Sequence, residues 1–247
     1  MVTVLVTGGS TGIGKAICKE FNLVGYEVIN AAMEPEDTKM GDSLDYSSRL
    51  RYAHCDVTDT ATLMGVIRGN KPDILVNNAG ILPLTDFLLQ TWSEMKRIID
   101  TNLMAPIIAA NLAIDEFIDN PKEYPRGRLD IINIASMSGY YPDPDTPTYG
   151  ASKAGLINFT QSIAGAYNTK NVFCNCICPG LVDTKLCDGE APDEILNLMP
   201  GGPFRTNEVS ELVYWLTTSQ LNGAVLPFDK AVNHSFHSWN KIFIKGK

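Results

Sequence analysis

The stretch Thr7–Gly14 reads TGGSTGIG and directly follows the apolar run Val2 to Thr7. Apolar side chains then recur at three- or four-residue steps from Ile13 to Val24, which predicts an amphipathic helix that Gly25 ends. Glycines between a strand and a helix allow a tight turn, and they let an anion approach the N–H groups at the positive end of the helix dipole. The sequence therefore predicts a diphosphate cradle after the first strand.

Apolar runs alternate with helical patterns along the rest of the chain. Several runs are continuously apolar, as expected of parallel strands covered on both faces. The β-α-β order predicts one Rossmann-like α/β domain over residues 1–247: a doubly wound, seven-stranded parallel sheet with helices on both faces, in three α/β/α layers, with ligands at the carboxyl ends of the strands. The six strands expected after the first are Glu27 to Ala32, Leu50 to Cys55, Ile74 to Asn77, Leu129 to Ala135, Val172 to Cys178 and Ala224 to Phe228.

Composition excludes several classes of protein. The chain has 247 residues, 45% of them apolar, so it has enough apolar side chains for a large core and disorder is not expected. A formal net charge of −8 without a Lys/Arg cluster disfavours nucleic acid as a partner. Because the sequence shows neither a leader pattern nor a run of roughly 18 uninterrupted apolar residues, we expect a cytoplasmic protein without a membrane segment.

Six cysteines are few for this length, and they predict reduced core residues rather than a disulfide framework. Cys174, Cys176 and Cys178 alternate along one predicted strand, which leaves a metal site as the alternative to core packing. Their steps of about 6.6 Å along one strand face are wider than a single tetrahedral ion would comfortably join. Core packing is the preferred interpretation, and no metal site is predicted.

The glycine spacing favours a dinucleotide over a nucleoside triphosphate. The loop has Gly-x-x-x-Gly-x-Gly spacing from Gly8 to Gly14, and no Gly-Lys-Ser/Thr follows it, as it would in a P-loop. An ordinary glycine-rich strand-to-helix turn is the alternative. The position of the loop, after the first strand and before an amphipathic helix, weakens that alternative.

Further motifs follow in order along nearly the whole chain. They are Asp56-Val57 after the third strand, the NNAG run 77–80 after the fourth, Asn102 in the next helix, Ser136 after the fifth strand, the pair Tyr149 and Lys153, and Pro179 to Thr184 after the sixth strand. Each motif alone is weak. In this order and at these intervals they resemble the short-chain dehydrogenase/reductase family, in its compact single-domain branch.

Tyr149 and Lys153 lie four residues apart, so on a helix they share a face. A free phenol loses its proton near pH 10, and lowering that pKa by about three units requires roughly 4 kcal/mol in favour of the phenolate. A nearby ammonium supplies stabilisation of that sign. A surface pair that packs stem against ring is the alternative. Ser136 at the carboxyl end of a predicted strand, with the glycine loop upstream, favours the catalytic interpretation.

The resemblance implies an NAD(P)-dependent oxidoreductase of ketones and secondary alcohols. In it, Tyr149 is the general acid in reduction and the base in the reverse direction, and Lys153 lowers the tyrosine pKa and binds the nicotinamide ribose. Ser136 holds the substrate oxygen, and Asn102 anchors a water that links Lys153 to solvent. From the residues alone, Ser136 could equally cap a turn, and Asn102 could satisfy a neighbouring backbone group.

The resemblance also implies the cofactor contacts. Tyr149 and Lys153 contact the nicotinamide half. The diphosphate is lined by Gly8, Ser10, Thr11, Ile13 and Gly14; Asp56 and Val57 flank the adenine, Asn78 the adenosine ribose, and Val182 and Thr184 the nicotinamide amide. From the residues alone, Asp56 could also be a loop residue or a helix cap, since Thr58 and Asp59 follow it.

The choice between NAD and NADP depends on the end of the second strand, where an acidic residue accepts from a ribose 2′-hydroxyl and an arginine binds a 2′-phosphate. Ala32 and Met33 occupy that place, and Thr11 stands where a basic residue often binds the phosphate. Glu34 lies close by, and no Lys or Arg follows until Lys39. These residues favour NAD slightly over NADP.

Specificity is expected from the segments that overhang the strand ends: Leu82 to Thr85, Met137 to Thr148 and a substrate lid at about 185–205, rich in glycine and proline. The stretch Asp119 to Arg128 reads as a solvated surface loop. Asp229-Lys230-Ala231 departs from the Asp-Gly-Gly of the family. The resemblance implies a homodimer or homotetramer, packed through the helix that carries Tyr149 and the helix before it.

Two other functions are compatible with the fold. A catalytically silent dinucleotide sensor or scaffold would not require Ser136, Tyr149, Lys153 and Asn102 together. An epimerase or dehydratase of the longer sugar-nucleotide branch would share the Tyr-Lys pair, but it usually needs a larger C-terminal substrate region than this chain has after its seventh strand.

Overall fold

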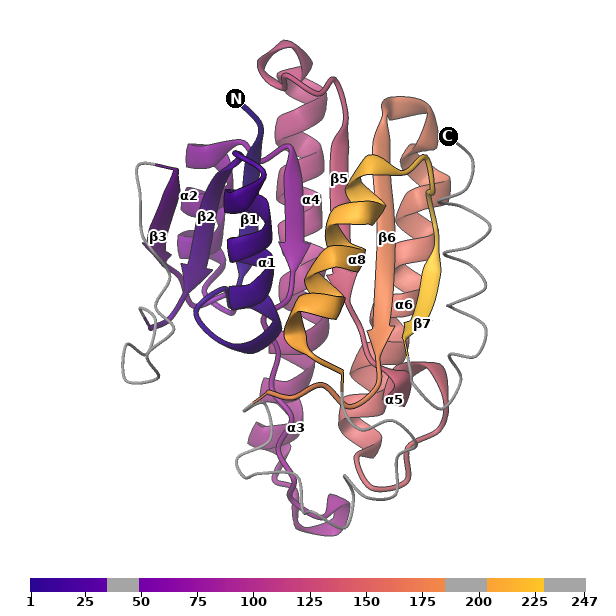
Figure 1. Ribbon diagram of the computed structural model, residues 1–247. Helices are drawn as coiled ribbons and strands as arrows, with labels where there is room; N and C mark the ends of the chain where they lie inside the picture. The colour runs from indigo at the N-terminus through magenta and orange to yellow at the C-terminus, as the bar shows by residue number, and fades with distance from the viewer. Residues whose placement is uncertain (35–48, 185–203, 229–247) are drawn as a thin grey trace.

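The computed structural model describes residues 1–34, 49–184 and 204–228, and within these ranges seven parallel strands form one sheet (Figure 1). The strand order is β3-β2-β1-β4-β5-β6-β7. The strands are β1 (Thr3–Thr7), β2 (Glu27–Ala32), β3 (Leu50–His54), β4 (Ile74–Asn77), β5 (Leu129–Ile134), β6 (Val172–Pro179) and β7 (Val225–Phe228). The predicted doubly wound sheet is confirmed, with strand ends that differ from the prediction by one residue at most.

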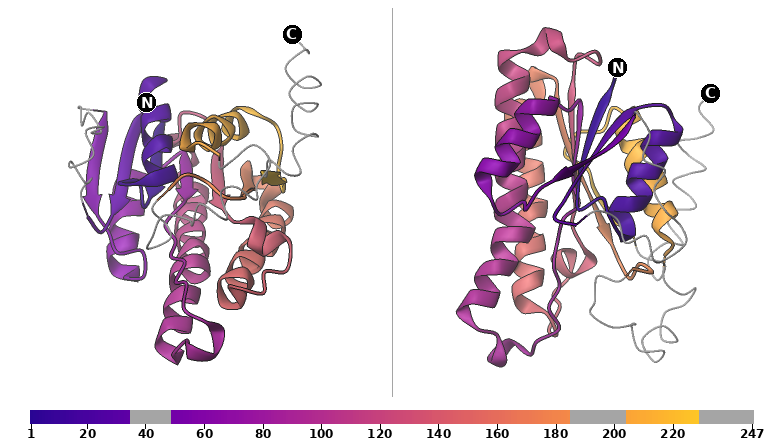
Figure 2. Two further views of the ribbon diagram at one scale, coloured as in Figure 1. Left: turned by 60° about the horizontal axis from the view of Figure 1, so that its bottom comes forward. Right: turned by 90° about the vertical axis from the view of Figure 1, so that its left-hand side faces the viewer.

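Helices cover both faces of the sheet, which gives three layers (Figure 2, right). Helices α1 (Gly12–Leu23) and α8 (Thr206–Thr218) pack together on one face, and α2 (Thr60–Asn70), α4 (Ala105–Asp119) and α6 (Pro147–Tyr167) cover the other. Successive residues of β1 alternate between the layers: Leu5 belongs to the core under α2 and α4, whereas Val4 and Val6 belong to the core under α1 and α8. This burial on both faces explains the continuously apolar strands.

Shorter elements connect these layers, and polar side chains cap the start of several helices. They are η2 (Phe87–Leu89), α3 (Trp92–Ile99), the π-helix η3 (Asp100–Met104), η4 (Pro121–Glu123), α5 (Met137–Tyr140) and η5 (Asn168–Lys170). The Asp59 carboxylate accepts from Ala61 N at 3.0 Å and so caps α2. Thr91 and Glu94 form a reciprocal capping box at α3.

The strand order reverses between β1 and β4, because β1 pairs with β2 on one side and with β4 on the other. The glycine loop follows β1 and the NNAG run follows β4, so the two segments meet at this switch point. Ligands of doubly wound sheets bind in the crevice outside such a point. The topology therefore places the predicted cradle at the binding edge of the sheet.

The stretch Asp119 to Arg128 is mostly exposed at the surface, as its prolines and charges predicted, but some of its side chains turn inward. Tyr124 is 4% exposed and packs edge-on against Phe117, with ring centroids 4.9 Å apart. Arg126 and Arg128 both pair with Asp130, whose side chain is fully buried, and the Arg126 Nη1 to Asp130 Oδ2 distance is 2.6 Å. These two arginines therefore serve a buried carboxylate on β5, because a buried charge needs a partner.

One helical run, Trp92–Asp119, is long and apolar enough to cross a membrane by length and composition. Half of its most apolar window is buried inside the protein. Ala109, Ala110 and Ala113 of this run lie in the core against the sheet. Packing within the core accounts for its apolar character.

The cysteines of β6 are core residues, as predicted. Cys174, Cys176 and Cys178 are fully buried, and Cys174 belongs to a different apolar cluster from the other two. Within the described ranges, no group of three or more His, Cys, Asp or Glu side chains is placed to hold a metal ion. Cys187, residues 185–203 of the lid predicted at about 185–205, and the tail from Asp229 lie outside the described residues.

Candidate active site

The glycine loop adopts the conformation that an anion cradle requires. Gly8 and Gly12 have φ values of +64° and +52°, which side chains with a Cβ rarely adopt. A Cβ on Gly14 would lie 2.3 Å from the Gly8 carbonyl oxygen, so only glycine lets the first turn of α1 close on the loop. Helix α1 begins at Gly12 and has no acidic residue in its first turn, so its positive end is not neutralised there.

Asn78 binds this loop from the neighbouring strand end. Its Nδ2 donates to the carbonyl oxygens of Thr7 and Gly8, both at 3.0 Å. The Thr7 hydroxyl in turn accepts from the N–H groups of Asn78 and Ala79, at 3.0 and 3.1 Å. Asn78 therefore holds the loop in shape, beside the adenosine ribose position that the resemblance implies for it.

The other residues predicted for the diphosphate lie in different surroundings. Thr11 is exposed and precedes α1, and Ile13 packs against the core under α1 and α8. Ser10 is buried, and its hydroxyl donates to the Glu34 carbonyl oxygen at 2.6 Å. The structure thus places Thr11 at the surface of the cradle and links Ser10 to the segment after β2.

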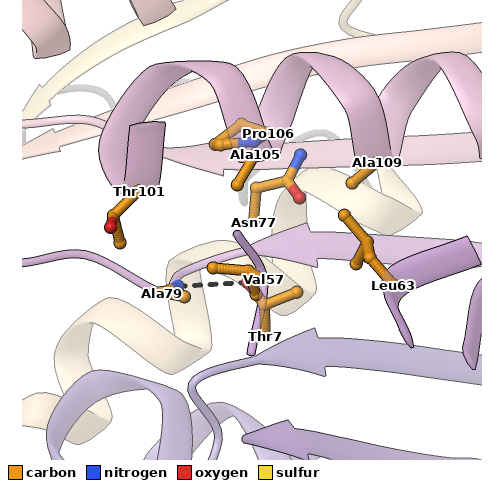
Figure 3. A pocket seen from close by; sticks show the side chains of 9 residues that line it. All are labelled: Thr7, Val57, Leu63, Asn77, Ala79, Thr101, Ala105, Pro106 and Ala109. Carbon is orange, nitrogen blue, oxygen red and sulfur yellow. Dashed lines mark hydrogen bonds between the residues drawn. The ribbon is translucent and has the colours of Figure 1, made fainter. Parts of the chain in front are cut away.

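The predicted adenine residues lie on the far side of the loop. The Asp56 Oδ1 accepts from the N–H and the hydroxyl of Thr58, at 2.9 and 2.7 Å, so part of this carboxylate serves the local turn. Val57 is 8% exposed. It lines a crevice too narrow for water (Figure 3), together with Thr7, Leu63, Asn77, Ala79, Thr101, Ala105, Pro106 and Ala109. Val57 is thus an almost buried residue beside the cradle, and Ala79 lies directly against Gly8.

Helix α6 brings Tyr149 and Lys153 together beneath the carboxyl end of β5. Both side chains are buried, and the Lys153 Nζ lies 5.7 Å from the centroid of the Tyr149 ring. The Lys153 Nζ donates to the Ile134 carbonyl oxygen at 2.8 Å. Ser136 follows two residues later in the chain and caps α5, where its Oγ accepts from Ser138 N at 3.1 Å. The structure therefore brings close together three of the four residues that the resemblance implies as a catalytic set.

Two glycines let α5 and the NNAG run approach this set closely. A Cβ on Gly139 would lie 2.6 Å from the Lys153 carbonyl carbon, so α5 rests directly on the α6 backbone. A Cβ on Gly80 would lie 3.3 Å from Asn102 Oδ1 and 3.5 Å from Lys153 Nζ. Gly80 therefore separates the predicted asparagine from the lysine by the width of one backbone.

Asn102 is fully buried in the π-helix η3, a form of helix that is frequent at functional sites. Its Oδ1 accepts from Ile81 N at 2.8 Å, and its Nδ2 donates to the Ile81 carbonyl oxygen at 2.9 Å. Both polar atoms of the amide are thus engaged with one residue behind the NNAG run. The backbone-satisfying role that the residues alone suggested for Asn102 is present in this structure.

Replacing Asn102 with alanine is expected to lower the free energy of unfolding by about 2 kcal/mol, because it leaves the Ile81 N–H and carbonyl without their buried partner. Urea unfolding followed by circular dichroism measures this change. Replacing Asn111, an exposed residue of α4, with alanine is the matched control and should change stability by less than about 0.5 kcal/mol. Equal stability of the two variants would contradict a stabilising role for the hydrogen bonds between Asn102 and Ile81.

Burial lowers the pKa of Lys153 to about 8. The neighbouring Cys178 does not neutralise this ammonium, because a hydrogen bond with Cys176 and burial raise the pKa of its thiol. Lys153 thus remains a cation below pH 8 in a region with little water. A cation in such surroundings acts strongly on a nearby hydroxyl.

Val182 and Thr184 close the site from the side of β6. Val182 pairs with Phe204 through an isolated bridge and is 9% exposed. The Thr184 methyl group lies 3.2 Å from where a Cβ on Gly12 would stand. Of the two residues expected at the nicotinamide amide, Thr184 therefore lies against the glycine loop.

Comparison with known proteins identifies the family. The family model described as short chain dehydrogenase matches residues 2–194. The chain belongs to the short-chain dehydrogenase family. It is similar to the 3-oxoacyl-[acyl-carrier-protein] reductase FabG of Rickettsia bellii, with 32% identity over 224 residues that cover 88% of this chain and 90% of that relative.

Solved structures share the fold of this short-chain dehydrogenase. The 3-ketoacyl-(acyl-carrier-protein) reductase from Brucella melitensis complexed with NADH has a TM-score of 0.82 at 22% identity, covering 92% of this chain and 96% of that one. ElxO with NADP bound has a TM-score of 0.79 at 26% identity, covering 92% and 97%. The chain is therefore an oxidoreductase of a family whose structures hold either nicotinamide dinucleotide.

Sequence reasoning missed several residues that shape this site. Asn30 was not predicted as a site residue, although a polar residue within the apolar run Glu27–Ala32 indicates a specific hydrogen-bonding role. Gly80 was recognised only as part of a motif. The Ile134 carbonyl oxygen carries no side-chain signal at all.

Proposed function

We propose that this short-chain dehydrogenase transfers hydride between NAD(P) and a ketone or secondary alcohol, using Tyr149, Lys153, Ser136 and Asn102. The observation that carries the proposal is that Tyr149, Lys153 and Ser136 lie close to the carboxyl end of β5. Tyr149 and Lys153 lie on one buried face of α6, and Lys153 Nζ reaches the Ile134 carbonyl two residues before Ser136. A dinucleotide sensor without turnover does not require this buried arrangement.

The chemistry of the site follows from these positions. As a carbonyl carbon gains hydride, negative charge develops on its oxygen, and a donor must supply a proton there. We assign that proton to the Tyr149 hydroxyl, with the Ser136 hydroxyl as the second group at the oxygen. The Lys153 cation favours the phenolate that remains after proton transfer. Asn102 holds Ile81 and Gly80 in place behind the lysine.

The residues present fit a nicotinamide dinucleotide, which when bound supplies the hydride. The support is the glycine cradle, where a Cβ on Gly14 would fill the space beside the Gly8 carbonyl and where Gly8 and Gly12 take positive φ values. Ala79 lies against Gly8 at one end of the loop, and Thr184 lies against Gly12 at the other. We propose NAD as the preferred form, since Glu34 stands beside the end of β2.

An absorbance assay tests the proposal. Purified protein is mixed with NADH or NADPH and a panel of ketones, and with NAD or NADP and the matching secondary alcohols, while absorbance of the reduced nicotinamide is followed. We expect turnover with at least one pair and a higher kcat/KM with NADH. Binding of the dinucleotide without turnover on any ketone or alcohol would favour the sensor or scaffold instead.

We also propose that the chain assembles as a homodimer or homotetramer through α4 and α6. A surface hollow of about 430 Å³ lies beside α6, lined in part by Gly150, Ala151 and Ala154. Large apolar side chains are exposed on the adjoining segment, with Leu88 and Trp92 each 88% exposed. The Thr148 hydroxyl donates to Gln90 Oε1 at 2.8 Å, so this segment lies against the start of α6. Clustered exposed apolar residues often mark an interface.

Replacing Trp92 with glutamate is expected to shift the assembly toward the monomer, because burying a charge in an apolar contact is unfavourable. Sedimentation velocity at several concentrations measures the shift. Replacing Leu23 with glutamate is the matched control, since Leu23 is 81% exposed on α1, on the opposite face of the sheet. An unchanged sedimentation coefficient for the Trp92 variant would contradict this interface.

We propose a cytoplasmic location as well. The free, buried cysteines support it, because thiols stay reduced in that compartment.

A further inference from the structure

The segment that follows β2 is tied to the glycine loop by a buried serine. The Ser10 hydroxyl donates to the Glu34 carbonyl oxygen at 2.6 Å and accepts from Asn30 Nδ2 at 3.1 Å. Ser10 is 7% exposed and Asn30 is fully buried, so both side chains are largely shielded from solvent. A Cβ on Gly9 would lie 2.6 Å from Asn30 Oδ1, so the asparagine fits only because Gly9 lacks a side chain.

A tyrosine of β3 binds the same segment from the other side. The Tyr52 hydroxyl lies 3.0 Å from the Ala32 carbonyl oxygen and 3.2 Å from that of Met33. Burial and then the negative charge of Glu34 raise the pKa of Tyr52, so its hydroxyl stays protonated and can donate to one of these carbonyls. The Glu34 carboxylate is therefore close enough to act on Tyr52, although it is exposed to solvent.

These hydrogen bonds hold the peptide from Ala32 to Glu34 between the glycine loop and β3. With a diphosphate on the glycine loop, the adenosine ribose belongs at the end of the next strand, β2. A carboxylate there accepts hydrogen bonds from ribose hydroxyls and repels a 2′-phosphate. Its selectivity depends on its position, because a freely moving surface carboxylate is well screened by water and salt.

We propose that Ser10, Asn30 and Tyr52 are positioning residues that hold Glu34 where it selects the dinucleotide with a free 2′-hydroxyl. The inference rests on the proposed function, because it requires the dinucleotide cradle at the glycine loop. It gives the Ser10 hydroxyl a different task from the diphosphate contact that the resemblance implies. The hydroxyl proton is already donated to the Glu34 carbonyl oxygen.

Direct binding of NADH and NADPH to the full chain, measured by titration calorimetry without substrate, tests this role. The readout is the ratio of the NADPH dissociation constant to the NADH dissociation constant. Ser10→Ala is expected to lower the ratio about tenfold, mainly through weaker NADH binding. Glu34→Gln should lower the ratio by a similar factor. The double variant should fall no further than Glu34→Gln alone, because the serine acts through Glu34.

Tyr52→Phe provides an independent test of the second contact and is expected to lower the ratio in the same direction. Two controls remove hydroxyls elsewhere: Ser162→Ala, on the exposed side of α6, and Tyr26→Phe, at the opposite end of β2. Both controls should leave the two dissociation constants unchanged. Thermal melting of every variant shows whether the fold persists.

Equal weakening of both dinucleotides by Ser10→Ala would overturn the proposal, since that result identifies a contact with the shared diphosphate. Additive effects in the double variant would overturn it as well. Failure of the proposed oxidoreductase function would give a different result. The wild type would then bind NADH selectively and Ser10→Ala would remove that selectivity, but no ketone or alcohol would be turned over. A wild-type protein that binds neither dinucleotide would overturn both.

Discussion

Replacing Tyr149 with phenylalanine is expected to lower kcat for carbonyl reduction by about a thousandfold, because it removes the proton donor while leaving the buried ring in place. The ring is 6% exposed, so phenylalanine fills the same volume and the helix packing persists. The measurement is kcat from NADH oxidation at saturating dinucleotide and ketone. Binding of NADH by titration calorimetry should change by less than about threefold, since the proposed loss is in the chemical step.

The Tyr26→Phe variant serves as the control for loss of a tyrosine hydroxyl. Tyr26 stacks on Phe21 at the amino end of the sheet, with ring centroids 5.9 Å apart. Its removal should leave kcat unchanged. If the Tyr149 variant reduced the same ketones as fast as the wild type, another group would have to deliver the proton, and the mechanism proposed for this site would be wrong.

Replacing Lys153 with methionine is expected to lower kcat/KM by about a hundredfold, because the variant keeps the buried stem and loses the cation that favours the phenolate. The same cation predicts the pH dependence of the wild type. Burial lowers the lysine pKa to about 8, so the ammonium is present below that pH and is lost as the pH rises through it. Wild-type reduction should therefore decline above about pH 8, and the methionine variant should lack that decline.

Stability provides the control for the lysine variant. A lysine whose folded pKa lies below its unfolded value disfavours folding below pH 8, and this penalty disappears as the pH rises toward the unfolded pKa. The methionine variant should consequently melt no lower than the wild type at pH 7 by differential scanning calorimetry. A large fall in melting temperature would mean that the bond from Lys153 to the Ile134 carbonyl is mainly structural, and the loss of activity would then have to be assigned to unfolding.

The strands and the proximity of the candidate catalytic residues could be predicted because their signals are local. A strand buried on both faces has to be apolar throughout, and seven such runs located the sheet to within a residue. Tyr149 and Lys153 lie one helical turn apart, so their proximity follows from helix geometry alone. Ser136 could be added because a strand end in a parallel sheet lies at the binding edge.

Composition and motifs did not reveal the long-range partners of individual side chains. Charges and prolines from Asp119 to Arg128 predicted a solvated loop and most of the stretch is exposed, but they did not reveal that Arg126 and Arg128 pair with a carboxylate buried on β5. Ser10 was assigned to the diphosphate through the family, and its partners are a carbonyl 24 residues away and an amide on β2. A charge or hydroxyl in the sequence does not reveal its partner.

The sequence by itself determined the order of strands and helices, the glycine turn and the pairing of tyrosine with lysine, because each depends on spacing within one element or between neighbours in the chain. Only the tertiary structure decided that Lys153 bonds the Ile134 carbonyl, that Asn102 clamps Ile81, and that Ser10 and Tyr52 hold the segment at Glu34. These contacts join residues from separate strands and helices. Their partners are chosen by how the layers pack, which no local pattern encodes.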